Sequence, residues 1–192
     1  NRKENLTNKI FFGLKAGINS STAHASDDVG FSPKSKLGYA TGVFLSIPIM
    51  DKIGIQPELL ISQKGFKASG NNPDNIYQFT RTTTYIDIPL MLAVKPASFI
   101  TFMAGPTYSR LIKEKYAFGN ASTTVTQEED FINEDNRKNT FGYGGGLDIN
   151  INHFVISARA NWDLQKNISR KGAITPRYNN GWYQATLGYR LY

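Results

Sequence analysis

The chain has 192 residues, enough for one domain of ordinary size or one eight-stranded barrel with sizeable loops, and its formal net charge is +7. It contains no cysteine, which excludes disulfide frameworks, thiolate zinc sites and cysteine nucleophiles. Apolar residues make up 40% of the chain and no run of about 18 of them occurs, so a membrane-spanning helix is excluded.

The chain opens with a polar segment, residues 1–9, which we expect to be a flexible lead-in. This segment lacks the apolar region of a secretory signal peptide. We therefore expect that an export signal has been removed from this sequence. Residues 10–192 are predicted to form a single β-barrel domain.

Eight segments of the chain alternate large apolar residues with small or polar ones. A period of two residues is typical of a β-strand with two different faces. In chain order, the predicted strands are 10–19, 37–48, 53–64, 83–95, 100–111, 140–151, 154–164 and 181–192. Their lengths are close to the roughly 9–11 residues that a tilted strand needs to cross a bilayer.

The predicted hairpin at 140–165, TFGYGGGLDININHFVISARANWDLQ, has the most informative faces. One face carries large apolar groups that end in aromatic residues, and the other carries Gly142, Gly144 and Gly146 together with charge. Glycine weakens an exposed strand, so its repetition indicates crowding on the polar face. The lumen of a narrow barrel provides such crowding when apolar residues face lipid and small or charged residues fill the interior.

The connections between the predicted strands alternate between long and short. Long polar connections follow every odd-numbered strand, at 20–36, 66–82, 113–139 and 166–180, and the three others are tight. In an up-and-down meander, alternate connections lie at the same end, so four long loops share one rim and three short turns share the other. Outer-membrane barrels show this asymmetry. The sequence therefore predicts an all-β, eight-stranded, antiparallel, up-and-down transmembrane β-barrel.

Charged residues on the polar face of the strands are nearly balanced in sign. A closed lumen requires this balance, because buried charges must be paired. The opposite face has almost no charge in mid-strand and carries aromatic residues near several strand ends, as a lipid-facing surface would. We predict a structural charge network in the lumen, formed by Lys15, Glu58, Asp87, Asp148, Arg159, Asp163 and Arg190.

Six short motifs occur in this order along the chain: GLKAGIN, GVFLSIPI, IQPELLISQKGF, YIDIPLMLAVKP, GYGGGLDI and LGYRLY. Through them, nearly the whole chain resembles the PorT-like or "porin family" outer-membrane β-barrel domain of Gram-negative bacteria. The closing strand is similar to the family's assembly signal, with Tyr189, Arg190 and Leu191 where the family has tyrosine, any residue and an aromatic. The resemblance implies export and insertion in the outer membrane. It assigns no activity to most such barrels and links some to protein secretion.

Basic residues near the rim of long loops are candidates for contacts with phosphates of outer-leaflet glycolipid. They are Lys67, Arg81, Lys115, Arg170 and Lys171. Simple solubility explains these residues equally well. Nucleic acid is a poorer explanation of the positive charge, since no recognition helix or RNA-binding aromatic motif occurs. The predicted partners are therefore membrane lipid, including glycolipid, and a protein of an outer-membrane complex.

Other motifs favour solvated loops or packing over chemistry. The acidic residues of 128–135 offer oxygens for calcium, but they lack EF-hand spacing. His24, near Ser20, Ser21 and Asp27, is the only histidine with the surroundings of a lipid hydrolase, and a polar loop explains it better. The glycines of FGYGGG lack the following helix that a dinucleotide fingerprint requires. We predict no catalytic residue, no cofactor and no metal site.

The sequence thus predicts a non-catalytic outer-membrane barrel that acts as a structural or accessory subunit of a secretion or assembly complex. Its extracellular loops would contact lipid or a partner protein. Two alternatives stay open. One is a narrow channel or a binder of a small solute in the outer membrane. The other is a soluble, lipocalin-like ligand-binding barrel, in which the apolar face would point inward.

Overall fold

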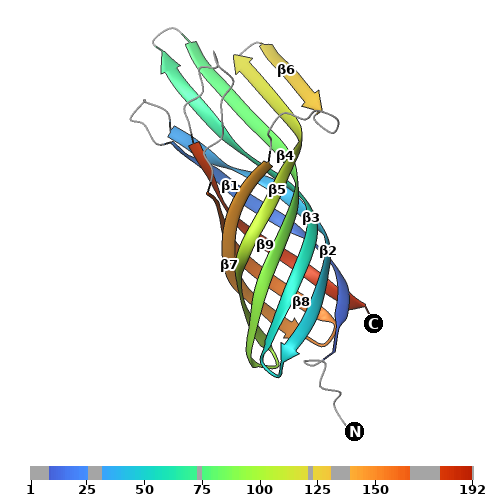
Figure 1. Cartoon of the computed structure of the whole chain (residues 1–192). Helices are drawn as coiled ribbons and strands as arrows, with labels where there is room; N and C mark the ends of the chain where they lie inside the picture. Colours follow the sequence, from blue (N-terminus) through green and yellow to red (C-terminus); the bar gives the residue numbers. More distant parts are fainter. Residues whose placement is uncertain are drawn as a thin grey trace.

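Eight long strands close into a slender antiparallel barrel, and a short ninth strand extends the wall beyond one rim (Figure 1). The computed structural model describes residues 9–25, 32–72, 75–120, 123–130, 139–164 and 178–191. Within these ranges, no helix is long and apolar enough to cross a membrane. The strands are β1 (Phe11–Ala25), β2 (Ser32–Met50), β3 (Ile53–Asn72), β4 (Asn75–Ala97), β5 (Ile100–Asn120), β6 (Thr123–Asp130), β7 (Asn139–Ile151), β8 (Phe154–Asp163) and β9 (Tyr178–Leu191).

Main-chain pairing runs antiparallel around the whole ring. The first and last strands close it, because β1 pairs with β9 from Phe12↔Leu191 to Ala25↔Tyr178. One rim holds the start of β1, the end of β9 and the short turns (Figure 1). These turns lie at 51–52, 98–99 and 152–153. The predicted eight-stranded, up-and-down topology is confirmed.

At the opposite rim, the strands continue further than the sequence predicted. β3 runs to Asn72 and β4 begins at Asn75, so the predicted loop 66–82 is almost entirely a hairpin. The predicted loop 113–139 contains the end of β5 and the whole of β6. The predicted loop 20–36 likewise contains the end of β1 and the start of β2, so three of the four predicted long loops are largely strand. Ladder hydrogen bonds join main-chain groups, so polar segments rich in threonine and aromatic residues also form strands.

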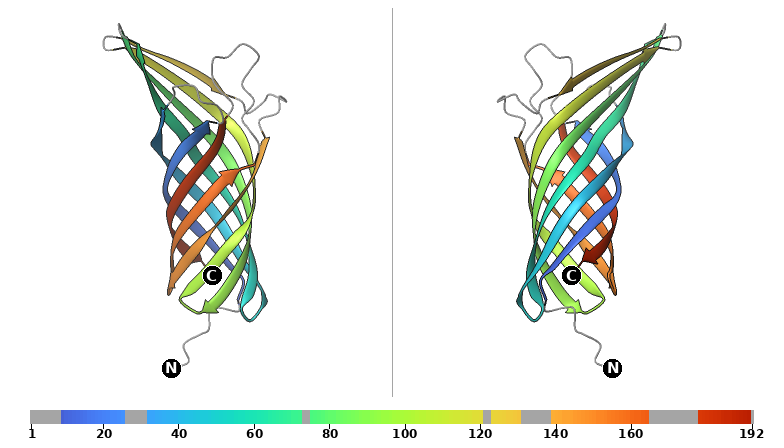
Figure 2. Two further views of the ribbon diagram at one scale, coloured as in Figure 1. Left: turned by 90° about the vertical axis from the view of Figure 1, so that its left-hand side faces the viewer. Right: turned by 90° about the vertical axis from the view of Figure 1, so that its right-hand side faces the viewer.

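These extensions form an arm, which we define as residues 65–72 of β3, 75–84 of β4, 113–120 of β5, and β6. The arm rises beyond the rim of β7 and β8 and leans away from the barrel axis (Figure 2). The lower part of β5 pairs with β7 up to Arg110, and its upper part pairs with β6. The end of the barrel opposite the short turns is thus taller on one side than on the other.

The two faces of the barrel strands have opposite chemistry. Leu90, Ile156 and Trp162 are 49%, 47% and 41% exposed on the outside, whereas Glu58 and Arg159 are each 4% exposed inside. Such a large apolar exterior fits hydrocarbon rather than water. The predicted orientation is confirmed. The soluble lipocalin-like alternative requires the apolar face to point inward, so it is wrong.

The glycines of β7 allow close approach on the lumen side. A Cβ on Gly144 would lie 2.0 Å from Oδ1 of Asn161, which is a lumen side chain of β8. A Cβ on Gly146 would lie 1.9 Å from the carbonyl oxygen of Ala158. Neither distance is sterically allowed. The crowding that the repeated glycines indicated therefore comes from a side chain at Gly144 and from the neighbouring strand at Gly146.

Replacing Leu90 by Arg tests the membrane orientation. Leu90 lies near the middle of the lipid-facing part of β4, where a charge would be placed in hydrocarbon. We expect Leu90→Arg to lower the free energy of unfolding in lipid vesicles by about 2–4 kcal/mol, measured by urea titration. Ser98→Arg, in a short turn, is the control and should change it by less than about 0.5 kcal/mol. Equal losses in the two variants would contradict the orientation.

Candidate functional site

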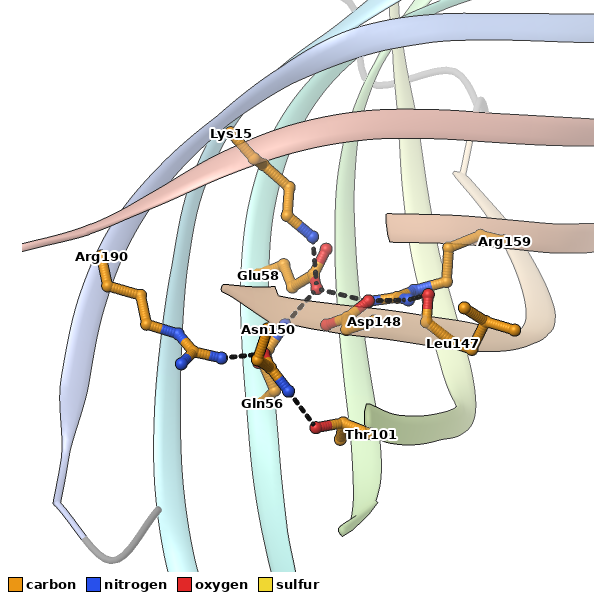
Figure 3. Close-up of polar contacts among 9 residues, drawn as sticks. All are labelled: Lys15, Gln56, Glu58, Thr101, Leu147, Asp148, Asn150, Arg159 and Arg190. Atoms are coloured by element: carbon orange, nitrogen blue, oxygen red, sulfur yellow. Dashed lines mark hydrogen bonds and ion pairs between the residues drawn. The ribbon is translucent and has the colours of Figure 1, made fainter. Parts of the chain in front are cut away.

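Charged side chains from four strands meet in the lumen, on the side of the short turns (Figure 3). Oε1 of Glu58 on β3 accepts hydrogen bonds from Nζ of Lys15 and from Nε2 of Gln56, both at 2.8 Å. Arg159 on β8 places Nη2 3.5 Å from the same oxygen and Nη1 2.5 Å from Oδ1 of Asp148. We call these five residues the lower cluster. Its two cations and two carboxylates sum to zero charge.

The strand phases explain why the lower cluster can form. Its four charged residues are each at most 4% exposed, so each stands on the inward phase of its strand. Gly146 is the cross-strand partner of Arg159, and its lack of a side chain lets the backbone of β8 approach β7 closely at this point. Nη1 of Arg159 also donates to the carbonyl oxygen of Leu147 at 3.4 Å. A buried charge costs several kcal/mol unless it is paired, so mutual pairing is what permits these groups inside the barrel.

A polar chain continues from the lower cluster toward the short turns (Figure 3). Arg190 donates a hydrogen bond to Oδ1 of Asn150, and Asn150 donates to Oγ1 of Thr101 at 3.0 Å. The guanidinium group of Arg190 lies 5.2 Å from the centroid of the Phe11 ring. The structure thus places Arg190 in a chain of neutral hydrogen-bond partners, one layer away from the carboxylates of the lower cluster.

A second group of lumen residues lies on the side of the arm. Nζ of Lys64 is 3.1 Å from the Asp87 carboxylate, 3.6 Å from the centroid of the Trp182 ring and 4.7 Å from that of Tyr85. We call these four residues the upper cluster. Lys64 is only 1% exposed, and a desolvated cation over aromatic faces gains about 2 kcal/mol. The sequence placed Lys64 and Asp87 on the polar phase and predicted Asp87 in the charge network; the aromatic residues on the same phase of β4 and β9 are the signal that it missed.

Side chains fill the space between the two clusters almost completely. The cavity at this level has a volume of about 10 Å³, which holds about one water molecule. Its walls include Glu58 and Arg159 of the lower cluster and Asp87 and Trp182 of the upper cluster. The described part of the lumen is therefore too full at this level to admit a solute.

Two further predicted residues have separate surroundings. Asp163 lies in the lumen and is 5% exposed. Arg81 stands in the arm, where it forms an ion pair with Glu114 and lies 5.5 Å from the centroid of the Tyr116 ring. Because Glu114 engages the guanidinium group, the position of Arg81 argues against its predicted contact with glycolipid phosphate.

The other predicted phosphate contacts are distributed unevenly. Lys67 and Lys115 are exposed on the arm. Lys115 is the cross-strand partner of Glu128 on β6, so pairing of the two strands sets an acidic residue beside it. Arg170 and Lys171 lie outside the described residues. Of the five predicted contacts, Lys67 is the one that the structure describes as exposed without an acidic cross-strand neighbour.

The acidic segment 128–135 is only partly a loop, since residues 123–130 form β6. Residues 131–135 and the side chain of His24 lie outside the described part of the structure. Among the residues that are described, no group of three or more His, Asp and Glu side chains is placed to hold a metal ion. Among the described residues, the candidate functional features are therefore the two lumen clusters and the surface of the arm.

Removing the Glu58 carboxylate tests how far mutual pairing stabilises the lower cluster. Glu58→Ala leaves the buried Lys15 and Arg159 with a single carboxylate, so we expect the free energy of unfolding in lipid vesicles to fall by about 3–5 kcal/mol. Urea titration followed by tryptophan fluorescence measures it. Glu58→Gln keeps the hydrogen-bond acceptor and should lose less. Lys52→Ala, in an exposed turn, is the control, and a loss no larger than in this variant would contradict the prediction.

A family model described as "Outer membrane protein beta-barrel domain" matches residues 1–169 of the chain. No curated protein matches the chain. The matched region covers β1 to β8, with the whole of the lower cluster and Lys64, Tyr85 and Asp87 of the upper cluster; β9 lies beyond it.

Several solved structures have a similar fold. Ail, the attachment invasion locus protein of Yersinia pestis, in complex with the heparin analogue sucrose octasulfate, has a TM-score of 0.53 at 13% sequence identity, over 95% of this chain and 99% of that chain. Another structure of Ail has a TM-score of 0.50 at 12% identity, over 94% and 98%. Neisserial surface protein A has a TM-score of 0.50 at 9% identity, over 94% and 97%. At these identities the likeness concerns the fold alone.

Proposed function

Because the chain belongs to the outer membrane protein β-barrel domain family, we propose that it is a non-catalytic barrel that acts as a structural or accessory subunit of a larger outer-membrane assembly. It resides in the outer membrane of a Gram-negative bacterium. The narrower affiliation with PorT-like barrels, and with it a role in secretion, stays a prediction.

The filled lumen is the observation that carries this proposal. Paired charges and aromatic rings occupy the interior, and the cavity between the two clusters holds about one water molecule. A barrel of eight strands is just wide enough to be filled by its own side chains. The barrel would therefore bind its partners through its outer surfaces, which are the lipid-facing wall and the arm.

The arm supplies a surface for a partner protein. β6 pairs with β5 on one side, and no described strand pairs with its other edge. Its sequence, TTVTQEED, contains neither proline nor lysine, which commonly protect an exposed edge. An extended segment of a partner can add to such an edge through main-chain hydrogen bonds. The three acidic residues at its end favour a basic partner segment.

Planar-bilayer recording tests the sealed lumen. We expect the purified protein to show no stable large conductance, because the lower and upper clusters obstruct the lumen at two levels. Glu58→Ala should leave the record unchanged, since Trp182 and Lys64 still fill the upper level. Stable openings in the unaltered protein would favour the alternative function, a narrow channel.

Photo-crosslinking in intact cells tests the arm as a protein-binding surface. A photoreactive residue at Val125, on β6, should give protein adducts, whereas one at Leu90, on the lipid-facing wall, should not. Combining the Val125 probe with Thr126→Pro should abolish the adducts, because proline has no main-chain N–H and disrupts strand pairing along β6. The barrel itself should still migrate as a folded species in an unheated gel. Equal protein adducts at both positions would contradict this role for the arm.

A further inference from the structure

Three lysines gather where β2 and β3 reach the extracellular rim. Lys34 and Lys67 are direct cross-strand partners, and both side chains are exposed. The side chain of Lys36 passes over Gly65, with Cδ 3.2 Å from the position that a Cβ on this glycine would occupy. Its Nζ lies 3.5 Å from the carbonyl oxygen of Leu37. Like charges directly opposite each other destabilise a pair of strands, so this arrangement has a cost in the absence of an anion.

The described residues provide no acidic partner for this cluster. Lys15, Lys64, Arg81 and Arg159 are among the described side chains that pair with carboxylates, and none of these ion pairs involves Lys34, Lys36 or Lys67. Partial burial and the nearby charge of Lys67 together lower the pKa of Lys36. The local field is therefore positive, and a bound anion would offset the repulsion among the three ammonium groups.

An apolar surface begins directly below the lysines. Leu37, Tyr39 and Ile61 are 68%, 45% and 45% exposed on the outside of the barrel. They lie on the same two strands as the lysines, on the side of the lipid-facing wall. An anion held by the lysines could therefore carry acyl chains that run down this surface. A soluble anion would leave the apolar surface unused, so the position favours a lipid headgroup.

We infer that Lys34 and Lys67 form a binding site for a phosphate group of an outer-leaflet glycolipid, and that the charge of Lys36, which stands on the inward phase beside them, strengthens the local positive field. The inference rests on the proposed function, in which the barrel contacts membrane lipid, and it assigns that contact to one place. The predicted contacts at Arg81 and Lys115 do not belong to it, because Arg81 pairs with Glu114 and Lys115 lies beside Glu128.

Native mass spectrometry of the full-length protein in detergent tests the site with two probes. One probe is lipid A that carries both phosphates, and the other is the same lipid after phosphatase treatment. We expect Lys34→Ala/Lys67→Ala to weaken binding of the phosphorylated lipid by about 30-fold, since each lysine near an anionic surface contributes a factor of about five. The dephosphorylated lipid should bind the unaltered protein weakly and should not distinguish it from the double variant.

Two matched variants serve as controls. Lys34→Arg/Lys67→Arg keeps both charges and should retain binding within a few-fold, whereas Lys52→Ala removes an exposed lysine at the opposite rim and should have no effect. Equal weakening by Lys52→Ala, or equally tight binding of both lipids, would overturn the inference. Displacement of the lipid by millimolar inorganic phosphate would overturn the choice of a lipid over a soluble anion.

The same variants separate this inference from the proposed function. If the lysine site is wrong, the double alanine variant still gives protein adducts from Val125 and still lacks conductance. If the proposed function is wrong, those two measurements fail in the unaltered protein, whatever its affinity for lipid A.

Discussion

Inside a bilayer, every main-chain N–H and C=O group must find its partner within the protein, because hydrocarbon offers none. The pairing of β1 with β9 satisfies this requirement by removing the last two free edges of the sheet. All other features of the spanning region depend on this closure. It sets an inside and an outside, and therefore decides which phase of each strand meets lipid and which is enclosed.

Closure also determines the chemistry of the interior. Polar residues on the inward phase have little water to solvate them, so they bind one another. Lys15, Glu58, Asp148 and Arg159 reach zero net charge by pairing across four strands. Lys64 combines a carboxylate with two aromatic rings. The described interior is therefore filled by paired side chains at the level of both clusters.

Beyond the bilayer the requirement for closure ends, and the wall becomes uneven. β3, β4 and β5 continue past the rim, and β6 joins them to form the arm. The result is an open sheet edge at β6. At the boundary between the closed barrel and the part beyond the bilayer, Lys34 and Lys67 face each other just above exposed apolar residues. The proposed protein contacts and the inferred lipid contacts would thus lie at different places on the end of the barrel opposite the short turns.

The sequence by itself determined the barrel. Segments such as 140–164 alternate with a period of two, and strands of this kind can have all their main-chain groups hydrogen-bonded in a membrane only when they close into a barrel. The sequence also identified Glu58, Asp148 and Arg159 as lumen residues from their phase. Only the tertiary structure decided which charges meet: Glu58 and Lys15 are 43 residues apart, and the stagger between strands sets their contact. The arm was not predicted for a related reason. Outside the membrane, strands that pair through main-chain hydrogen bonds need no alternation of apolar and polar side chains, so the sequence carries no such pattern there.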